Sequence, residues 1–434
     1  MTNDESHGQS AEAGESTATG MRQSTQVAII GAGPAGLLLG HILGQAGIDY
    51  RILEARDKDY VLGRIRAGVL EQDSVDLLGK YGLDADLKAN GLTHHGIYLQ
   101  HEGERHHIDF AELTGRTVTV YGQQALVHHL VAEHERLGSQ LIFEATDVQP
   151  TQIESTKFES AQTDATQIDG ERASVAYTSP NGERITLDCD YIIGADGYHG
   201  VCRQAFPEGT LEVAERVYDF AWLGILADVA PSTDDLIYAL HRDGFAMHSM
   251  RSTTVSRLYL QVSPDDDIAN WSDERIWEAL QTRLGTEGWT LTEGPITEKS
   301  ILPMRSFVVS TLNYGRLYLV GDAGHIVPPT GAKGLNSAIA DVALLAEALQ
   351  AHYAGDDTGL EQYSDKALDR QWKVQHFSQW MTDMLHVHPA DGSAEQSAFD
   401  FQRQLGQIRY VTSSHAAQVS LAEQYAGLPF VDAR

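Results

Sequence analysis

Cysteine is scarce in this chain of 434 residues, which contains only Cys189 and Cys202. Two thiols do not support a disulfide framework, so the sequence predicts a protein of a reducing cytoplasm. Long apolar runs are also missing, and no stretch approaches the roughly 18 residues of a membrane helix. The N-terminus is acidic and polar, unlike a secretory signal. These absences exclude a membrane protein and a small secreted scaffold.

Positive charge is the second shortage. The chain has 31 Lys and Arg residues against 61 Asp and Glu residues, which gives a net charge of −30. A surface of this sign repels nucleic acid and anionic lipid, so neither is expected as a partner. Lysine is scarcer than arginine. This composition resembles that of proteins from a high-salt cytoplasm, and an ordinary acidic enzyme is the alternative.

Large apolar side chains are nearly absent from residues 1–22, which we expect to be a disordered tail. The rest of the chain is long enough for two or three domains. A short apolar strand at 27–30, a helix at 34–47 and a strand at 50–53 predict one βαβ unit.

Further along, alternating apolar residues predict an antiparallel sheet within 217–262. Residues 150–190 are polar and predict a hairpin region with a variable loop at 159–171. Additional strands are expected at 187–193 and 317–320. A long helix is expected at 335–353, and residues 357–434 are expected to be largely helical.

A glycine-rich loop joins the first strand to the first helix. Gly31 permits a tight turn, Gly33 lets backbone approach a pyrophosphate, and Gly36 allows close helix–strand packing. The helix N-terminus offers free amides to phosphates. Glu54 lies where an acid binds the adenosine ribose. The pattern predicts a dinucleotide site.

Two later segments narrow the dinucleotide to FAD. Gly194-Ala195-Asp196-Gly197 ends one predicted strand, and Gly321-Asp322-Ala323 ends another. The second leads into a Pro- and Gly-rich loop at 328–334 and a long helix. A cation at a helix N-terminus is unfavourable without an anion, so Lys333 indicates a nearby anionic ligand such as a reduced flavin.

Three longer runs carry a family resemblance. Residues 60–72, 117–123 and 325–336 resemble the single-component, FAD-dependent aromatic hydroxylases. The likeness extends from about Gln26 to Pro429 and is poor only in 145–185 and 385–410. It implies an α/β fold in which a Rossmann-like FAD-binding domain carries an inserted antiparallel β-sheet substrate domain and a helical C-terminal region. The implied divisions are an FAD-binding domain (23–97, 121–212 and 312–345), a substrate domain (98–120 and 213–311) and a helical interface region (346–434).

The resemblance also implies a reaction. NADPH, or alternatively NADH, reduces FAD, and O2 then forms a C4a-hydroperoxyflavin. The ring of 4-hydroxybenzoate attacks its terminal oxygen to give 3,4-dihydroxybenzoate and water. The expected partners are thus an aromatic acid, NAD(P)H and O2, together with a second copy of the chain in a homodimer.

Site residues follow from matching the family's motifs residue by residue. Tyr238 and Tyr425 match tyrosines that ionise the phenol, His94 carries the proton to solvent, and the Pro329 carbonyl faces the phenol oxygen. A buried carboxylate needs a forked cation. The matching substrate ligands are Arg251, Ser249 and Tyr259.

Coenzyme residues are implied in the same way. Arg257 matches a residue that steers an outward swing of the isoalloxazine, a gating motion. The additional FAD positions are Arg66, Gln123, Asp196, Asp322, Lys333, Leu335 and Asn336. The NAD(P)H positions are Arg64, Tyr60, His199 and Arg305. Arg56 and Lys58 favour a 2′-phosphate while Asp57 and Asp59 oppose it, so NADPH is favoured and NADH stays open.

Other interpretations remain. Tyr238 could be a core aromatic of a strand, and Arg251 and Arg257 could be surface charges. Adjacent histidines on a strand point to opposite faces, so we expect no metal site. The alternative functions are a hydroxylase of 3-hydroxybenzoate, salicylate or 4-aminobenzoate, a non-catalytic FAD-binding redox sensor, and an NAD-dependent dehydrogenase.

Overall fold

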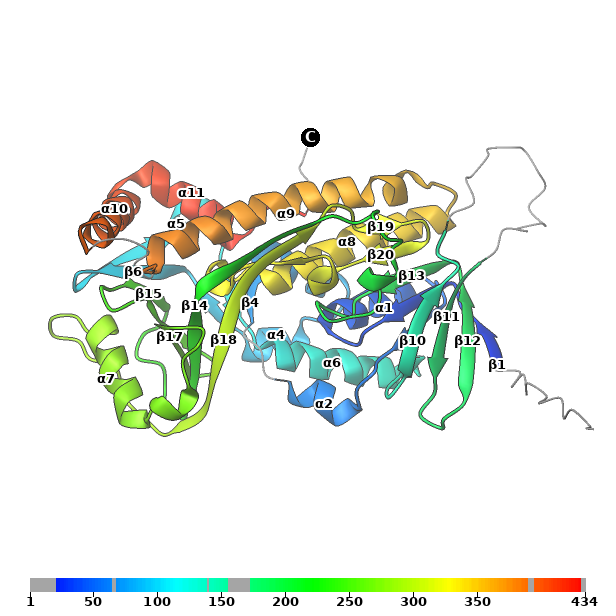
Figure 1. Cartoon of the computed structure of the whole chain (residues 1–434), viewed down its shortest axis with the longest axis horizontal. Coiled ribbons are helices and arrows are strands. Elements are labelled where there is room, and N and C mark those ends of the chain that lie inside the picture. The colour runs from blue at the N-terminus through cyan, green and yellow to red at the C-terminus, as the bar shows by residue number, and fades with distance from the viewer. Residues whose placement is uncertain (1–20, 65–67, 139, 155–171, 389–393, 431–434) are drawn as a thin grey trace, which may run out of the picture.

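The computed structural model describes residues 21–64, 68–138, 140–154, 172–388 and 394–430, and all structural statements concern these residues. Their strands form four sheets, and most of their helices pack between or beside the two largest sheets (Figure 1). The predicted class is confirmed: an α/β protein with a second, largely antiparallel sheet and a helical C-terminal region.

The first large sheet has six strands in the order β19-β20-β13-β2-β3-β9. All neighbours run parallel except β19 and β20. Every residue of β2 is buried, as expected for a strand covered on both faces. The strands are β2 (Val27–Ile30), β3 (Tyr50–Leu53), β9 (Leu141–Ile142), β13 (Tyr191–Gly194), β19 (Asn313–Tyr314) and β20 (Leu317–Leu319).

Helix α1 (Pro34–Gln45) follows β2 and packs against β3, α6 (Gln123–Arg136) and α8 (Gly334–Tyr353). It ends two residues before the predicted end, and Gly47 adopts a φ of 75° just beyond it. The βαβ unit of the sequence therefore forms, with Gly33 as the extended residue before α1.

Two expectations about strands were wrong. Met21 and Arg22, assigned to the disordered tail, belong to β1 (Met21–Ser24), where the Arg22 guanidinium pairs with Asp188 at 2.6 Å. The single strand expected at 187–193 is two strands, because β12 (Arg184–Cys189) and β13 lie in different sheets on either side of Asp190. The loop expected at 159–171 and residues 1–20 lie outside the described residues.

Two smaller sheets complete this half of the molecule. One has the order β1-β12-β11-β10 and the other β4-β8-β5. Their remaining strands are β10 (Thr146–Thr151), β11 (Ala173–Thr178), β4 (Val69–Glu71), β5 (Leu92–His94) and β8 (Val118–Val120). Short helices connect them: α2 (Lys58–Gly63), α3 (Gln72–Lys80), α4 (Ala85–Asn90) and α5 (Phe110–Thr114).

The second large sheet has eight strands in the order β21-β18-β14-β17-β16-β15-β6-β7. Its neighbours are antiparallel except β15 and β6, which run parallel because β6 arrives from a distant part of the chain. The strands are β6 (Gly96–His101), β7 (Glu104–Asp109), β14 (Val213–Ala227), β15 (Leu236–Leu240), β16 (Ala246–Met250), β17 (Ser256–Val262), β18 (Ile296–Val309) and β21 (His325–Ile326).

Helices cover both faces of this sheet. Helix α7 (Asp273–Leu284) packs against β15 and β16 through Ile276, Trp277 and Leu280. The opposite face shares a core with three C-terminal helices: α9 (Thr358–Leu385), α10 (Ala394–Ser413) and α11 (His415–Ala426). Helix α9 runs along the molecule from the six-stranded sheet to the eight-stranded sheet (Figure 1).

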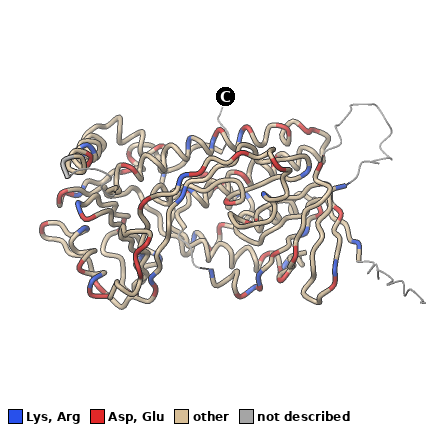
Figure 2. The backbone as a smooth tube through the Cα atoms, viewed as in Figure 1, with Lys and Arg blue, Asp and Glu red and all other residues tan. Residues whose placement is uncertain are grey.

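Acidic residues occur in every part of the described chain and are not confined to one end (Figure 2). Within the same residues, none of the helices combines the length and apolarity that crossing a bilayer requires.

Candidate active site

The glycine-rich loop is tightly packed at Gly31 and Gly36 and open at Gly33. Gly31 has a φ of 107°, and a Cβ there would lie 2.4 Å from the Ala195 carbonyl oxygen. A Cβ on Gly36 would lie 2.0 Å from the Gly31 carbonyl oxygen, so helix and strand touch there. No side chain caps the N-terminus of α1, and a Cβ on Gly33 would meet nothing within 4 Å. Open amides at an uncapped N-terminus fit a pyrophosphate.

Glu54 lies at the end of β3 beside this loop. Its two carboxylate oxygens accept hydrogen bonds from the Ala32 and Arg56 amides, each at 2.8 Å. These bonds fix the carboxylate next to the N-terminus of α1. Each oxygen keeps a lone pair that a ribose hydroxyl could use.

Asp322 occupies the 3-10 turn η3 (Gly321–Ala323) directly after β20. Its side chain is half-buried and makes no hydrogen bond with other described residues. By contrast, the Gly321 amide donates to the Asp341 carboxylate at 2.8 Å, and this bond fixes the position of the turn. A rigid turn that presents an uncommitted carboxylate suits the hydroxyls of a flavin side chain.

Lys333 is 2% exposed and points into the protein. Its ammonium donates to Glu71 Oε1 at 2.6 Å and to the Tyr425 carbonyl at 2.9 Å. Burial lowers the pKa of Lys333, and the charge of Glu71 opposes that effect. The sequence predicted a cation that faces a flavin, whereas the structure commits this ammonium to protein oxygens.

Asn336 is also fully engaged within the protein. Its amide oxygen accepts from the Glu71 amide at 2.9 Å and from the Ser74 hydroxyl at 2.8 Å. Its amide nitrogen donates to the Val69 and Ala332 carbonyls. Asn336 therefore joins the start of α8 to β4 and α3, and Leu335 stands half-buried beside it.

Asp196 holds a turn after β13. Its Oδ2 accepts from the Cys202 amide at 2.9 Å, while Oδ1 is buried without a partner among the described residues. Burial raises the pKa of this carboxyl. A Cβ on Gly200 would collide with Asp196, so the turn closes tightly over the carboxylate.

Two tyrosines meet in the interior. The hydroxyl oxygens of Tyr238 on β15 and Tyr425 on α11 lie 2.6 Å apart, and each side chain is 1% exposed. Burial, the first cause for both, raises their pKa values well above that of a free phenol. The hydroxyls form a short, dry hydrogen bond across which a proton can move.

The strand register places the predicted substrate ligands on the same face as Tyr238. Tyr238 lies opposite Met247, which lies opposite Tyr259, and Ser249 lies opposite Arg257. Directly opposed residues share a face, as do residues two apart on one strand. This is the face that packs against α9 and α11.

Arg251 and Arg257 place two guanidinium groups at one end of this face. Arg257 is 8% exposed and donates from Nε to the Tyr259 hydroxyl at 3.0 Å. Burial lowers the pKa of Arg251, and the positive charge of Arg257 lowers it further. An anion between or beside these groups would relieve both effects.

A cavity of about 330 Å³ opens beside Arg251. It is lined by Tyr121, Gly122 and Gln124 at the start of α6 and by Ser252 after β16. The Arg251 guanidinium lies against Gly122, where a Cβ would come within 2.7 Å of it. Gln123 is the first residue of α6, between the lining residues Gly122 and Gln124 in the sequence.

Comparison with known proteins agrees with this geometry. The family model described as "FAD binding domain" matches residues 24–378. The p-hydroxybenzoate hydroxylase of Acinetobacter baylyi is 46% identical over 409 residues, which are 94% of this chain and 96% of that protein. The chain belongs to the FAD-dependent aromatic hydroxylases. FAD is accordingly its cofactor, and the chain is an oxidoreductase.

More distant relatives show how far the hydroxylase family extends. The 3-amino-4-hydroxybenzoate 2-monooxygenase of Streptomyces cremeus is 25% identical, over 83% of this chain and 88% of that protein. The solved p-nitrophenol 4-monooxygenase of Pseudomonas putida superposes with a TM-score of 0.74 at 19% identity, covering 94% and 100% of the two chains. The latter likeness concerns the fold alone.

The positions expected to hold NAD(P)H lie at the surface of the hydroxylase. His199 and Arg305 both contact the Tyr198 ring, at 4.9 and 4.6 Å. Tyr60 is 47% exposed beneath the Arg56 guanidinium, and Arg64 is exposed after α2. In the described structure, no hydrogen bond, ion pair or ring contact joins these two groups of residues. Arg66 lies outside the described residues.

Around the expected 2′-phosphate position, two of the charged side chains of the hydroxylase are already bound to other protein groups. Lys58 pairs with Glu135 at 2.5 Å, and Asp57 caps α2 by accepting from the Tyr60 amide at 2.7 Å. Arg56 therefore has the guanidinium most available to a phosphate, and NADPH stays the favoured prediction.

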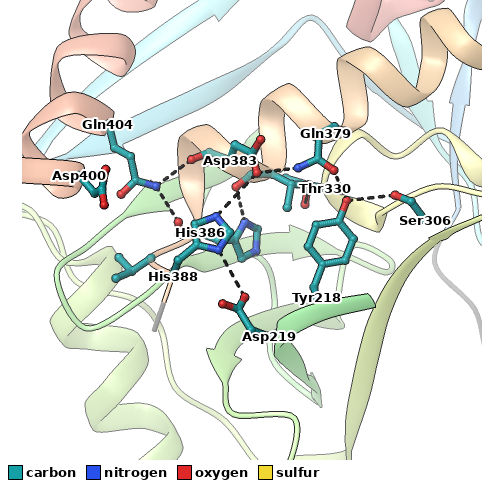
Figure 3. Close-up of polar contacts among 12 residues, drawn as sticks. Tyr218, Asp219, Ser306, Thr330, Gln379, Asp383, His386, His388, Asp400 and Gln404 are labelled. Carbon is teal, nitrogen blue, oxygen red and sulfur yellow. Dashed lines mark hydrogen bonds and ion pairs between the residues drawn. The ribbon is translucent and has the colours of Figure 1, made fainter. Parts of the chain in front are cut away.

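The loop with Pro329 is anchored to α9. The Pro329 carbonyl accepts the Ala332 amide at 2.9 Å, which leaves it one lone pair for a ligand. Thr330 lies beside α9 (Figure 3), and its hydroxyl accepts from the Thr382 hydroxyl at 2.9 Å. The end of α9 in turn holds the sheet, because His386 accepts from the Trp222 indole at 2.7 Å.

Two acidic residues of the hydroxylase site were missed by sequence reasoning. Glu71 binds Lys333 and also Arg370, the latter at 3.3 Å. Asp235 lies between His94 and His107 at the start of β15. Glu71 lies within the family-like run at 60–72, but nothing in that run marks it as a partner of Lys333. For Asp235, its position three residues before Tyr238 could have drawn attention to it.

Proposed function

We propose that the chain hydroxylates 4-hydroxybenzoate to 3,4-dihydroxybenzoate, with FAD as cofactor and NADPH and O2 as co-substrates. The supporting observation is one sheet face that has two guanidinium groups at one end, Arg257 buried and Arg251 half-buried, and the Tyr238–Tyr425 pair among the same strands. A para-hydroxylated aromatic acid presents an anion and an acidic phenol at opposite ends. The Acinetobacter baylyi relative bears the name of the enzyme for this substrate.

The residues divide the work by chemistry. Arg251, with Ser249 and Tyr259, would bind the carboxylate, and charged hydrogen bonds of this kind contribute about 1.5–3 kcal/mol each. Tyr238 would accept the phenolic proton and pass it to Tyr425, because their oxygens are 2.6 Å apart. Removal of that proton makes the ring electron-rich at the carbon beside the phenol.

The flavin supplies the redox chemistry: hydride uptake from the nicotinamide and activation of O2. The residues placed to hold it are Gly31, Gly33, Gly36, Glu54 and Asp322, and the structure fits the group at the uncapped α1 N-terminus. The homodimer and the cytoplasmic location predicted from the sequence are part of the proposal.

Stopped-flow reduction of the bound flavin tests this function directly. We expect 4-hydroxybenzoate to accelerate reduction by NADPH strongly, because an enzyme gains from coupling coenzyme oxidation to substrate occupancy. The same measurement with NADH fixes the coenzyme preference. Equal, slow reduction with and without the acid would indicate a redox sensor instead. Faster turnover of 3-hydroxybenzoate, salicylate or 4-aminobenzoate would indicate a sister hydroxylase.

Replacement of Arg251 by alanine is expected to weaken 4-hydroxybenzoate binding at least tenfold, equal to about 1.4 kcal/mol. The physical reason is that the substrate carboxylate loses its hydrogen bonds to the forked, partly buried guanidinium of Arg251. Titration of the flavin absorbance with the acid measures the dissociation constant. Arg275→Ala removes a guanidinium from α7, where it lies over Trp271, and should leave that constant unchanged. An unaltered constant in Arg251→Ala would remove Arg251 from the site.

A further inference from the structure

Three side chains form a continuous polar path from the interior to the surface of the eight-stranded sheet. His94 Nδ1 lies 3.0 Å from Asp235 Oδ1, and His107 Nε2 lies 2.8 Å from Asp235 Oδ2. Burial decreases along the path: the side chains of His94, Asp235 and His107 are 1%, 13% and 33% exposed. Three separate elements, β5, the start of β15 and β7, converge to build it.

The path begins close to the tyrosine pair. Burial is the main cause of the raised pKa of Tyr425, and the negative charge of Asp235 adds to it, so the carboxylate and the phenol sense each other. Asp235 directly precedes β15, the strand that contains Tyr238. Asp235 thus lies near the buried hydroxyls and contacts both histidines.

We propose that Asp235 and His107 are positioning residues that extend the phenol's proton exit from His94 to solvent, an inference that rests on the proposed function. A proton taken up by His94 leaves from Nδ1 to Asp235 Oδ1. The Asp235 carboxyl group then turns its O–H towards His107, whose ring carries its proton on Nδ1 and accepts the new proton at Nε2. His107 releases the Nδ1 proton to water, which leaves Nε2–H as a donor to Asp235. Asp235 is again a carboxylate and both rings are again neutral, and His107 regains its first tautomer by proton exchange with water.

The groups that surround the path suit this role. Although burial alone would raise the pKa of Asp235, the neighbouring imidazoles of His94 and His107 lower it, so the carboxylate rests ionised. Burial, with Arg105 and His94, lowers the pKa of His248 to about 4, so His248 does not compete for the proton at neutral pH. The Tyr98 ring packs at 4.8 Å from that of His107 and fixes its orientation.

The test measures proton release when 4-hydroxybenzoate binds, using a pH-indicator dye in weakly buffered stopped-flow solution. His107→Gln keeps a hydrogen-bond donor for Asp235 but cannot carry a proton. We expect this variant to bind the acid with the parent's dissociation constant and to release the proton at least tenfold more slowly. Added imidazole should restore the rate, because a small base can replace the lost exit.

His106→Gln is the matched control, since His106 precedes His107 on β7 and points to the opposite face, where it stacks on His101. It should release protons at the parent's rate. Asp235→Asn should slow release as His107→Gln does. Parental release in His107→Gln, or slow release that imidazole fails to restore, would overturn the proposal. If the unmodified enzyme binds the acid without releasing a proton, the proposed function fails as well, which separates the two results.

Discussion

The Tyr238→Phe variant should bind 4-hydroxybenzoate as tightly as the parent and hydroxylate it at least about a hundredfold more slowly, the lower range for loss of a positioned acid–base group. The side chain is 1% exposed and its hydroxyl makes a 2.6 Å bond to Tyr425. Phenylalanine fills the same space and leaves the carboxylate end untouched. Without the hydroxyl, the phenol keeps its proton and the ring stays a poor nucleophile.

The measurement compares 3,4-dihydroxybenzoate formed with NADPH consumed. In Tyr238→Phe, most of the oxidised coenzyme should appear as hydrogen peroxide rather than product. Tyr191→Phe is a suitable control, because it removes the hydroxyl of a buried tyrosine from the six-stranded sheet, where that hydroxyl lies 3.4 Å from His352. A normal product yield in Tyr238→Phe would refute the proton path through this tyrosine.

The Lys333→Met variant should lose about 3 kcal/mol of folding stability, the lower end of the range for breaking a buried ion pair. Its ammonium and the Glu71 carboxylate are each 2% exposed and 2.6 Å apart. Methionine leaves Glu71 buried with one weaker partner, Arg370 at 3.3 Å. Because Arg370 still pairs with Glu71, we expect a loss of stability at the lower end of the range for a broken buried ion pair.

Denaturant unfolding of the holoenzyme, followed by tryptophan fluorescence, measures the loss. The double variant Glu71→Gln/Lys333→Met removes both charges and should recover much of it. Lys373→Met alters an exposed pair with Asp369 on α9 and should change stability by less than about 1 kcal/mol. A loss in Lys333→Met no larger than in Lys373→Met would mean that the Glu71 pair contributes little.

The βαβ unit could be predicted because its evidence is local. Gly31 and Gly36 are needed where backbone approaches backbone, and these contacts fix their spacing in the sequence. Tyr238 and Tyr425 are different, since neither residue carries a local signal. Only the longer family motifs indicated them, and the structure brings their hydroxyls together across 187 residues.

Other features could not have been predicted, because they depend on contacts between distant residues. Glu71 meets Lys333 and Arg370 across more than 260 positions, and no periodicity encodes such a pair. The segment 187–193 was predicted as one strand, yet at Asp190 the chain passes from one sheet to another. Met21 and Arg22 were assigned to the tail because the ion pair of Arg22 with the distant Asp188 cannot be seen in the local sequence.

Helix α9 limits how this enzyme can open. Its 28 residues, about 42 Å at 1.5 Å per residue, are tied to the six-stranded sheet by the Tyr363 hydroxyl, which donates to the Leu319 carbonyl at 2.8 Å, and near the other end by the Thr382–Thr330 and His386–Trp222 bonds. An opening motion that separates the two large sheets would have to break buried hydrogen bonds near both ends of α9. Entry of the coenzyme and release of the product therefore require smaller displacements than a separation of the two sheets.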